Sequence, residues 1–494
     1  MMAPPPRFHL RRHSSADVVE LIQKFLLPLT IFIYTGLSHS IVENLPGFPA
    51  KLPFSLETGY IGVGPNEEVQ LFYYFFESEG NPQDDPLLLW LTGGPGCSGL
   101  SPILYEIGPI TIDYANSNGS LPALKLHEYS WTKVANIIFI DQPAGTGFSY
   151  AKTREAYYSN DTTSATLTYD FLRKWLINHP KYLKNPLYIG GDSYSGIILP
   201  LVVDHVYGEL ENEPLLNMKG YILGNPFTDT YSDVNERVQY AHRMGLLSNG
   251  LYKLAKQMCH GNYVNVDVEN VLCQNVLERV NQCLNKVRAS HILEPWCGDR
   301  IWNGEGYMPL EHLLSQENIQ TNFLQSIATL TKSWCRLDNL LFSISWANDK
   351  SVQKALNVRE GTKTDWIRCN TSIANSTTKS DGTTIYVKNV PSTMKYHTNF
   401  THKSCRVLIY SGDHDLLVPH TSTENWIDSL KLPIQSDWRP WFVEGQIAGY
   451  TMRYVKGAYE LTYATVKGAG HTAPEFNPKQ CLPMVRSWFN EKTL

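Results

Sequence analysis

A sharp strand-to-helix turn at residues 191–196 constrains this chain more than any other feature. The hexapeptide Gly-Asp-Ser-Tyr-Ser-Gly follows the apolar run 185–190, which predicts a buried strand, and precedes the apolar run 197–203, which predicts a buried helix. Such a turn lifts the hydroxyl of Ser193 out of the sheet and directs a helix N-terminus at a developing negative charge. Ser195 stands where the strict pattern has a second glycine, and a small residue satisfies the steric demand there. The turn predicts a nucleophilic serine, with a surface serine in an ordinary turn as the alternative.

Two later segments offer the partners that a nucleophilic serine needs. An apolar strand at 407–411 leads into a loop that carries Asp413 and Asp415, and a later strand opens onto a glycine-rich loop with His471. The order serine, aspartate, histidine along a chain is typical of α/β-hydrolases. We therefore expect Ser193 to attack, His471 to accept its proton and Asp415 to hold the imidazole. Asp413 is the competing acid, and Asp415 is preferred because it stands three residues before a Val-Pro step.

An early glycine-rich loop predicts the site that stabilises an oxyanion. The strand Leu87–Leu91 is followed by Thr-Gly-Gly-Pro-Gly-Cys-Ser-Gly at 92–99. Glycines leave backbone N–H groups free to approach a substrate closely. We expect the N–H groups of Gly94 and Tyr194 to be the two donors, because this fold takes one from the early loop and one from the residue after the nucleophile.

The remaining pattern predicts an α/β-hydrolase fold with a central, mostly parallel sheet and an inserted helical cap. A helix is expected at 164–178, where apolar residues fall on one face. The expected organisation is a signal peptide at 1–40, a first core part at 41–229, the cap at 230–349 and a second core part at 350–494. The expected strands are Leu71–Phe76, Leu87–Leu91, Ile137–Ile140, Pro186–Ile189, Tyr221–Leu223, Val407–Tyr410 and Leu461–Val466. The segment 301–321 is the best candidate for a flexible or processed linker.

The N-terminus predicts entry into the secretory pathway. Three arginines precede the apolar stretch 25–34, and a small, polar region follows it, so we expect cleavage between about residues 38 and 42. An uncleaved signal anchor is the alternative, and no stable membrane span is expected after cleavage. Secretory entry agrees with the Asn-x-Ser/Thr sequons at Asn118, Asn160, Asn370, Asn375 and Asn399.

Composition excludes several classes of function. The 494 residues carry a formal net charge of −5, which argues against a nucleic-acid partner. A hydrophobic content of 43% is typical of a globular chain with a large core. The 9 cysteines suit an oxidising compartment, and the odd number leaves at least one unpaired within the chain. Their spacings contain no paired C-x₂-C pattern, so neither a metal nor a cofactor is expected.

Taken together, five spaced motifs resemble the serine carboxypeptidase family. The resemblance runs from about residue 45 to the C-terminus and is strongest to the plant serine carboxypeptidase-like branch, which contains acyltransferases that use 1-O-β-glucose esters. The motifs are Trp-Leu-Thr-Gly-Gly-Pro-Gly-Cys-Ser at 90–98, Asp-Gln-Pro-Ala-Gly-Thr-Gly-Phe-Ser-Tyr at 141–150, Gly-Asp-Ser-Tyr-Ser-Gly at 191–196, Gly-Asn-Pro at 224–226 and Gly-His-Thr-Ala-Pro at 470–474.

The resemblance also implies disulfide pairings. It pairs Cys97 with Cys335 and Cys259 with Cys273. The usual partner of Cys297 is missing, so Cys283 is our choice for a third pair. The remaining cysteines stay unassigned: Cys369, Cys405 and Cys481.

Departures from the peptidase pattern predict the reaction. Peptidases of the family usually carry asparagine at the position of Thr92 and glutamate at the position of Asp192, where these residues grip the C-terminal carboxylate of a peptide. Thr92 has a single hydroxyl donor, and Asp192 is shorter by one methylene, or about 1.5 Å of reach. Glu106 matches a further acidic position of that network. Together with Gly93, these three are the expected substrate-binding residues.

The resemblance therefore implies an acyltransferase. It would move a hydroxycinnamoyl or related acyl group from a 1-O-β-glucose ester to an acceptor hydroxyl, both small molecules, in the vacuole or outside the cell. The alternative is a serine carboxypeptidase that releases C-terminal amino acids at acid pH. A non-catalytic binding protein on the same scaffold is a third possibility, which an intact triad argues against.

Overall fold

The structure is a computed structural model that describes residues 39–117, 121–210, 216–296, 300–302, 307–309, 336–362, 365–378 and 382–494. The predicted signal peptide lies outside these ranges, apart from its last two residues. The sequon at Asn118, the cysteines Cys297 and Cys335, and most of the predicted linker 301–321 also lie outside them.

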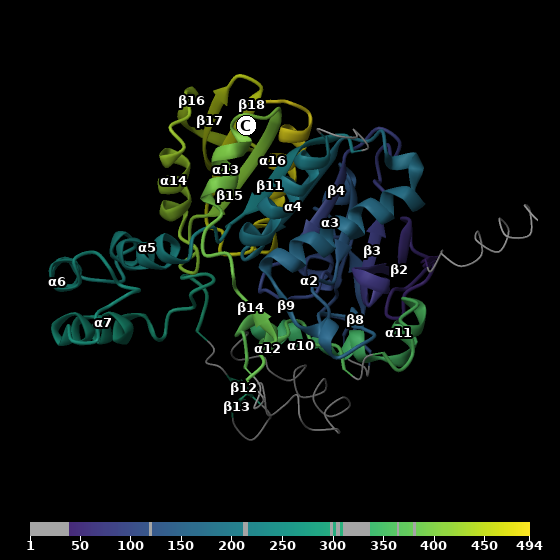
Figure 1. The fold of residues 1–494 in the computed structure, drawn as a ribbon, viewed down its shortest axis with the longest axis horizontal. Helices are drawn as coiled ribbons and strands as arrows, with labels where there is room; N and C mark the ends of the chain where they lie inside the picture. Colours follow the sequence, from purple (N-terminus) through teal and green to yellow (C-terminus); the bar gives the residue numbers. More distant parts are fainter. Residues whose placement is uncertain are drawn as a thin grey trace, which may run out of the picture. The chain divides into compact units, whose positions relative to one another are not determined.

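A 12-stranded mixed sheet forms the centre of the molecule (Figure 1). Its middle strands, from β7 to β18, run parallel, and both flanks are antiparallel. β8 (Tyr150–Ala151) pairs with β3 beside this path. The strand order is β1 (His39–Ile41), β2 (Leu56–Val63), β3 (Val69–Phe76), β7 (Asn136–Ile140), β4 (Leu87–Leu91), β10 (Leu187–Asp192), β11 (Met218–Gly224), β15 (Cys405–Gly412), β18 (Tyr459–Val466), β17 (Gln446–Lys456) and β16 (Ile434–Val443).

Both faces of the sheet are covered, because successive side chains of a strand point to opposite sides. Along β3, Leu71 and Tyr73 pack into one core cluster, while Phe72 and Tyr74 pack into the other. The first cluster includes residues of α3 (Asp161–Asn178), α4 (Ser195–Leu210), α13 (Met394–Phe400) and α14 (His420–Ser429). The second includes residues of α2 (Leu100–Tyr105), α10 (Arg336–Asn348), α11 (Lys350–Ala355), α15 (Ala473–Phe476) and α16 (Pro478–Phe489). Strands buried on both faces explain why these segments are continuously apolar in the sequence.

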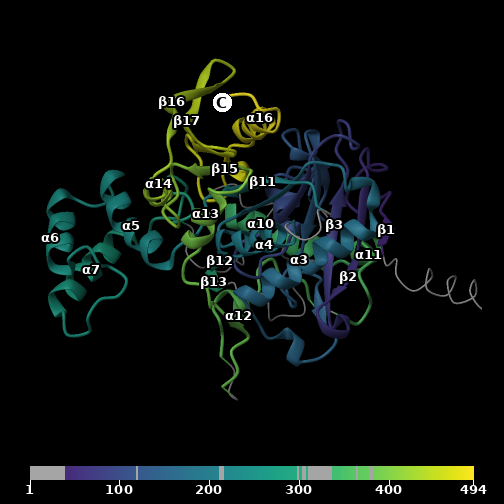
Figure 2. The ribbon, with the colours of Figure 1, turned by 45° about the horizontal axis from the view of Figure 1, so that its top comes forward.

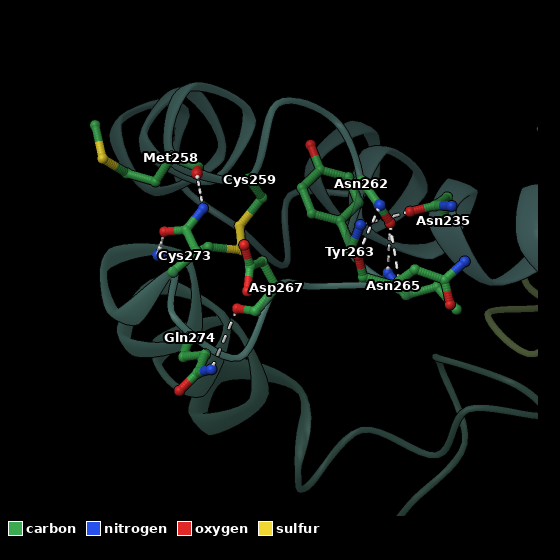
Figure 3. Close-up of a disulfide and its surroundings, with 11 residues drawn as sticks. Asn235, Met258, Cys259, Asn262, Tyr263, Asn265, Asp267, Cys273 and Gln274 are labelled. Atoms are coloured by element: carbon green, nitrogen blue, oxygen red, sulfur yellow. Dashed lines mark hydrogen bonds between the residues drawn. A yellow bond between two sulfur atoms is a disulfide. The ribbon is translucent and has the colours of Figure 1, made fainter.

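The inserted cap contains α5 (Thr230–Arg243), α6 (Asn249–Cys259) and α7 (Val271–Leu284), which share a separate small core. α6 and α7 lie side by side and extend away from the sheet in both ribbon views (Figures 1 and 2). A disulfide between Cys259 and Cys273 joins the end of α6 to the first turn of α7 (Figure 3). This bond agrees with the pairing that the family resemblance implies.

The expected fold class is confirmed, with differences at the edges. Every expected strand lies in an observed one, although β10 begins at Leu187 rather than Pro186 and extends to Asp192, directly before the nucleophile. The helix expected at 164–178 begins earlier, at Asp161, because the side chain of Asn160 caps it by accepting a hydrogen bond from the N–H of Thr163. The antiparallel strands β2, β16 and β17 were not predicted. In the part of the chain that the structure describes, no helix is long and apolar enough to cross a membrane.

Candidate active site

The turn between β10 and α4 holds Ser193 in a conformation that side chains rarely adopt. Its φ is 56°. Two backbone hydrogen bonds fix the turn: the N–H of Ser193 donates to the carbonyl oxygen of Gly224 at 3.0 Å, and that of Phe227 donates to the carbonyl oxygen of Ser193 at 2.9 Å. A Cβ at Gly191 would lie 2.6 Å from the carbonyl oxygen of Leu91. The turn therefore needs a glycine there, and it presents the serine hydroxyl above the sheet as a nucleophile elbow does.

The structure brings Ser193, His471 and Asp415 into one hydrogen-bonded row. Nε2 of His471 lies 2.7 Å from Oγ of Ser193, and Nδ1 of His471 lies 2.7 Å from Oδ2 of Asp415. The Asp415 side chain is completely buried. A row with this spacing lets the imidazole take the serine proton while the carboxylate fixes its tautomer and stabilises its charged form.

Asp413, the competing acid, has a different position. Its Oδ1 accepts a hydrogen bond from the N–H of Gly468 at 2.7 Å and lies 2.5 Å from Nδ1 of His414. It thus ties the acid loop to the histidine loop without contacting His471. His414 is half-buried beside it, and its ring faces that of His291 at 5.8 Å.

Asn225, at the end of the next strand, holds the Asp415 carboxylate. Its Nδ2 donates to Oδ2 of Asp415 at 2.9 Å, and its Oδ1 accepts from the N–H of Gly412 at 3.1 Å. Oδ1 of Asp415 accepts from the N–H of Leu417 at 2.8 Å. Sequence reasoning singled out the Gly-Asn-Pro segment but assigned Asn225 no role. The signal was its position at the end of β11, next to the strand that carries the acid.

The imidazole of His471 is tuned by several charges. Burial is the largest single influence and lowers its pKa, but the charge and hydrogen bond of Asp415 and the charge of Asp192 raise it and together outweigh burial. Arg237 of the cap acts in the opposite direction. The net result is a pKa above the ordinary value for histidine, as expected where a buried imidazolium faces carboxylates.

The two expected oxyanion donors have free backbone N–H groups. Among the described residues, neither the N–H of Gly94 nor that of Tyr194 donates to a protein acceptor. The early loop also lies against the nucleophile, because a Cβ at Gly93 would be 2.6 Å from Cβ of Ser193 and 2.9 Å from the backbone nitrogen of Tyr194. Only glycine permits this approach. The arrangement leaves unused donors beside the serine, as an oxyanion site requires.

Thr92, Asp192 and Glu106 form a buried polar cluster behind the nucleophile. Within the described chain, Oγ1 of Thr92, Oδ1 of Asp192 and Oε2 of Glu106 are buried without a hydrogen-bond partner. Burial raises the pKa of Asp192 to about 6, against a lowering by His471 and by the backbone of Gly93. Burial, then repulsion from Asp192, raises the pKa of Glu106 well above the usual carboxyl range. Burial thus favours the protonated form of the Glu106 carboxyl, and in that form it can donate a hydrogen bond.

The cap segment that follows α7 contacts both catalytic loops. The carbonyl oxygen of Ala289 accepts hydrogen bonds from the N–H groups of Leu416, at 2.8 Å, and Leu417, at 3.1 Å. The carbonyl oxygen of Ser290 accepts from the N–H of His471 at 2.7 Å. Backbone contacts of this kind leave no side-chain pattern in the sequence. The cap therefore helps to position the acid and the base.

Helix α5 holds the acid loop from a second direction. Nε of Arg237 donates to the carbonyl oxygen of Leu417 at 2.9 Å, and the hydroxyl of Tyr240 donates to that of Asp413 at 2.7 Å. His242, further along the same helix, has its Nε2 2.7 Å from Oδ1 of Asn249. Its ring also stacks on Tyr252 at 4.2 Å, which is a structural role within the cap.

The disulfide beside the early loop corrects an expectation. Cys97 is bonded to Cys369, not to Cys335. The reason lies in the backbone around it: the N–H of Ser98 donates to the carbonyl oxygen of Arg368 at 2.8 Å, and the N–H of Asn370 donates to that of Gly96 at 2.9 Å. This antiparallel pairing sets the two cysteines opposite each other.

The proposed pair of Cys283 with Cys297 is not seen, since Cys283 is an exposed free thiol and Cys297 lies outside the described residues. Cys405 and Cys481 are buried free thiols.

The described sequons differ in how available their amides are. Asn375 and Asn399 are exposed, whereas Asn160 and Asn370 are half-buried helix caps. Nδ2 of Asn370, the atom that a glycan would modify, donates to the carbonyl oxygen of Gly145 at 3.1 Å. Asn375 and Asn399 are therefore the better-placed acceptors.

The fold is that of an α/β-hydrolase, and this row of side chains has the geometry expected of a serine, histidine and aspartate triad. Comparison with known proteins then assigns the family: the serine carboxypeptidase model matches residues 46–491, and the chain belongs to the serine carboxypeptidase family. "Serine carboxypeptidase-like 13" of Arabidopsis thaliana is 42% identical over 478 residues, which cover 96% of this chain and 100% of that protein. "Serine carboxypeptidase-like 17" of the same plant is 43% identical over 475 residues, 96% of this chain and 98% of that protein.

A solved structure supports the fold. The crystal structure of a prohormone-processing carboxypeptidase from Saccharomyces cerevisiae superposes with a TM-score of 0.67 and covers 92% of this chain and 95% of that one. The sequence identity is 17%, so this likeness bears on the fold alone.

Proposed function

We propose that this enzyme is an acyltransferase that moves an acyl group from a 1-O-β-glucose ester to an acceptor hydroxyl. The single observation that carries this choice is the composition of the buried cluster beside the nucleophile. The Ser193–His471–Asp415 row is complete, but Thr92 and Asp192 replace the asparagine and glutamate typical of the family's peptidases. The plant relatives agree at the family level, because their names state a likeness to carboxypeptidases.

In the first half-reaction, Oγ of Ser193 attacks the ester carbonyl carbon as its proton passes to Nε2 of His471. The carbonyl oxygen becomes an oxyanion, stabilised by the N–H groups of Gly94 and Tyr194 and by the N-terminus of α4. The tetrahedral intermediate then collapses. Its bond to the anomeric oxygen of glucose breaks, and His471 returns the proton to that oxygen, so that glucose leaves and an acyl ester of Ser193 remains.

In the second half-reaction, an acceptor hydroxyl takes the place of glucose. His471 accepts the hydroxyl proton, the acceptor oxygen attacks the acyl carbonyl, and collapse returns the proton to Oγ of Ser193. Water can react in the same way, so transfer requires that the bound acceptor reach the acyl-enzyme faster than water does.

The geometry of the buried cluster supports this choice over peptide cleavage. Thr92 offers one hydroxyl donor where an asparagine amide offers two, and Asp192 is shorter than glutamate. The grip on a peptide's free carboxylate is thereby weakened. The protonated Glu106 carboxyl and the Thr92 hydroxyl remain as donors and acceptors suited to a neutral polyol such as glucose.

The test gives purified wild type and Ser193→Ala a hydroxycinnamoyl glucose with a mixture of acceptor alcohols, and separately a blocked dipeptide at acid pH. Mass spectrometry identifies the products. We expect ester transfer that depends on Ser193 and little dipeptide cleavage. Rapid release of the C-terminal amino acid without an ester product would replace this proposal with the peptidase.

The serine carboxypeptidase remains the second candidate, because Glu106 and Asp192 still form a buried carboxyl pair. The double variant Thr92→Asn, Asp192→Glu tests whether these positions set the choice of substrate. We expect its rate of dipeptide cleavage relative to acyl transfer to rise at least about tenfold, the effect of restoring one or two hydrogen bonds to a charged group. An unchanged ratio would show that other residues select the substrate.

We further propose that the enzyme acts in the vacuole or outside the cell. The disulfides support passage through the secretory pathway, because such bonds persist in oxidising compartments and are rare in the cytosol.

A further inference from the structure

Asp161 is a buried carboxylate that has no place in the reaction described so far. It is the first residue of α3 and is completely buried. It follows Asn160 in the short strand β9 (Ser159–Asn160), which pairs with β14 (Tyr386–Val387). A carboxylate is costly to bury without partners, so its contacts need an explanation.

Three donors converge on this carboxylate. Oδ1 of Asp161 accepts hydrogen bonds from the hydroxyls of Tyr194 and Tyr386, each at 2.9 Å. Oδ2 accepts from the N–H of Val390 at 2.8 Å. Burial raises the pKa of Asp161, while the bonds from Val390 and the two tyrosines lower it. The carboxylate is therefore a fixed acceptor, held by backbone on one side and by two phenols on the other.

One of these phenols belongs to the residue after the nucleophile. The Tyr194 side chain is 8% exposed and stacks on the Phe227 ring at a centroid distance of 6.1 Å. Nζ of Lys388 lies over the Tyr194 ring, 5.3 Å from the ring centroid. The side chain of Tyr194 is thus fixed at its hydroxyl and along its ring, while its backbone N–H has no acceptor among the residues that the structure describes.

We propose that Asp161 is a positioning residue of the oxyanion hole, which fixes the Tyr194 hydroxyl and thereby the direction of the Tyr194 backbone N–H. The strained turn at Ser193 supplies the reason: a backbone held at a φ of 56° relaxes unless its neighbours restrain it. A buried hydrogen bond at the far end of the Tyr194 side chain provides that restraint. The inference rests on the role proposed above for Tyr194 as an oxyanion donor.

The two tyrosines provide a matched test, because each loses one hydroxyl bond to the same oxygen when changed to phenylalanine. Wild type, Tyr194→Phe, Tyr386→Phe and Ser193→Ala are compared on p-nitrophenyl acetate, an activated ester that needs the triad and the oxyanion hole whatever the natural substrate. We expect Tyr194→Phe to lower kcat about tenfold with KM within about twofold of wild type, a fraction of the loss on removing an oxyanion donor outright. Tyr386→Phe should keep kcat within about twofold.

The affinity for a tetrahedral inhibitor is a second measurement, and a loss of folding stability alone would not change it. An arylboronic acid binds covalently to a serine nucleophile and places an oxygen in the oxyanion hole. Its inhibition constant should rise for Tyr194→Phe by about the factor lost in kcat/KM and stay near wild type for Tyr386→Phe. Circular dichroism melts of all variants establish that they are folded. Should Tyr194→Phe not fold, Asp161→Ala takes its place, since it removes the acceptor of the Tyr194 hydroxyl, and the same loss in kcat is expected.

The outcomes separate this inference from the proposed function. Equal losses in both phenylalanine variants, or none in Tyr194→Phe, would overturn the positioning role and leave the acyltransferase standing. Ester turnover by wild type that does not depend on Ser193 would overturn both. Ester turnover that follows the expected pattern, without transfer from acyl glucose, would keep the positioning role and overturn the acyltransferase.

Discussion

Asp413 and Asp415 lie two residues apart in one loop, yet only Asp415 contacts the imidazole of His471. We expect Asp415→Asn to lower kcat for p-nitrophenyl acetate by about 10⁴-fold, because an amide favours the wrong tautomer and does not stabilise the imidazolium. Asp413→Asn keeps an acceptor oxygen for Gly468, so its loss should stay within about tenfold. Steady-state kinetics of the two purified variants measures both, and a reversed order would assign the acid to Asp413.

The carboxyl of Asp192 should set part of the pH dependence. His471 acts as a base only when neutral, so kcat/KM falls as the pH drops through its pKa, which lies above the ordinary value. Asp192 raises that pKa because a nearby negative charge stabilises the imidazolium. Asp192→Asn removes this charge and should move the acid limb of the profile to lower pH.

The measurement is kcat/KM for p-nitrophenyl acetate against pH. Asp113→Asn, a change at a half-buried carboxyl whose partners are Asn116 and Lys125, serves as the control and should leave the acid limb in place. A shift of the Asp192→Asn limb toward higher pH, or none, would contradict the assigned interaction.

At the scale of elements, the two disulfides close loops of very different length. Cys97 and Cys369 are 272 residues apart, whereas Cys259 and Cys273 are 14 apart. In the chain-entropy model, restricting the unfolded chain contributes about 5.6 kcal/mol to stability for the longer loop and about 3 kcal/mol for the shorter one. We therefore expect replacement of the first pair by alanine to lower the unfolding temperature more than replacement of the second pair.

The first pair should also affect catalysis, because Cys97 follows the glycines that approach Ser193. The second pair lies in the cap and should change kcat little. Thermal melts and ester kinetics of the two double variants measure both effects. A peptide map without reduction should contain Cys97 joined to Cys369, and a Cys97–Cys335 peptide would contradict the structure.

The same elements show how far the sequence alone leads. The sequence predicts the ends of the strands that precede Thr92, Ser193 and Asp415. Strands buried on both faces are continuously apolar, and the change to polar residues marks where each one ends. The flanking strands β16 and β17 are not, since their exposed faces break the apolar run. The partner of Cys97 depends on a backbone pairing between segments far apart in the chain, which no local pattern encodes. Asp161 was missed for a related reason: its partners Tyr194 and Tyr386 meet only in the folded core.

At the scale of the whole molecule, the cap and the core share the catalytic machinery. The core carries the serine, the acid and the base, but α5 and the segment after α7 hold the acid and histidine loops through backbone and side-chain bonds. A change in the cap can therefore alter the chemistry of the triad without contacting the substrate. Arg237 is the clearest route, because its charge acts on His471 while its Nε holds the loop at Leu417.

We expect Arg237→Met to move the acid limb of kcat/KM to higher pH, opposite to Asp192→Asn. The positive charge of Arg237 destabilises the imidazolium and so lowers the pKa of His471. Removing that charge raises this pKa, and a higher pH is then needed to keep His471 neutral and able to act as a base. Loss of the bond to Leu417 should also reduce kcat at the plateau, by about tenfold for a hydrogen bond from a charged group. Arg243→Met, at the exposed end of the same helix, is the matched control and should change neither quantity. A limb that stays in place for Arg237→Met, with only the plateau lowered, would mean that the cap acts on the triad through position and not through charge.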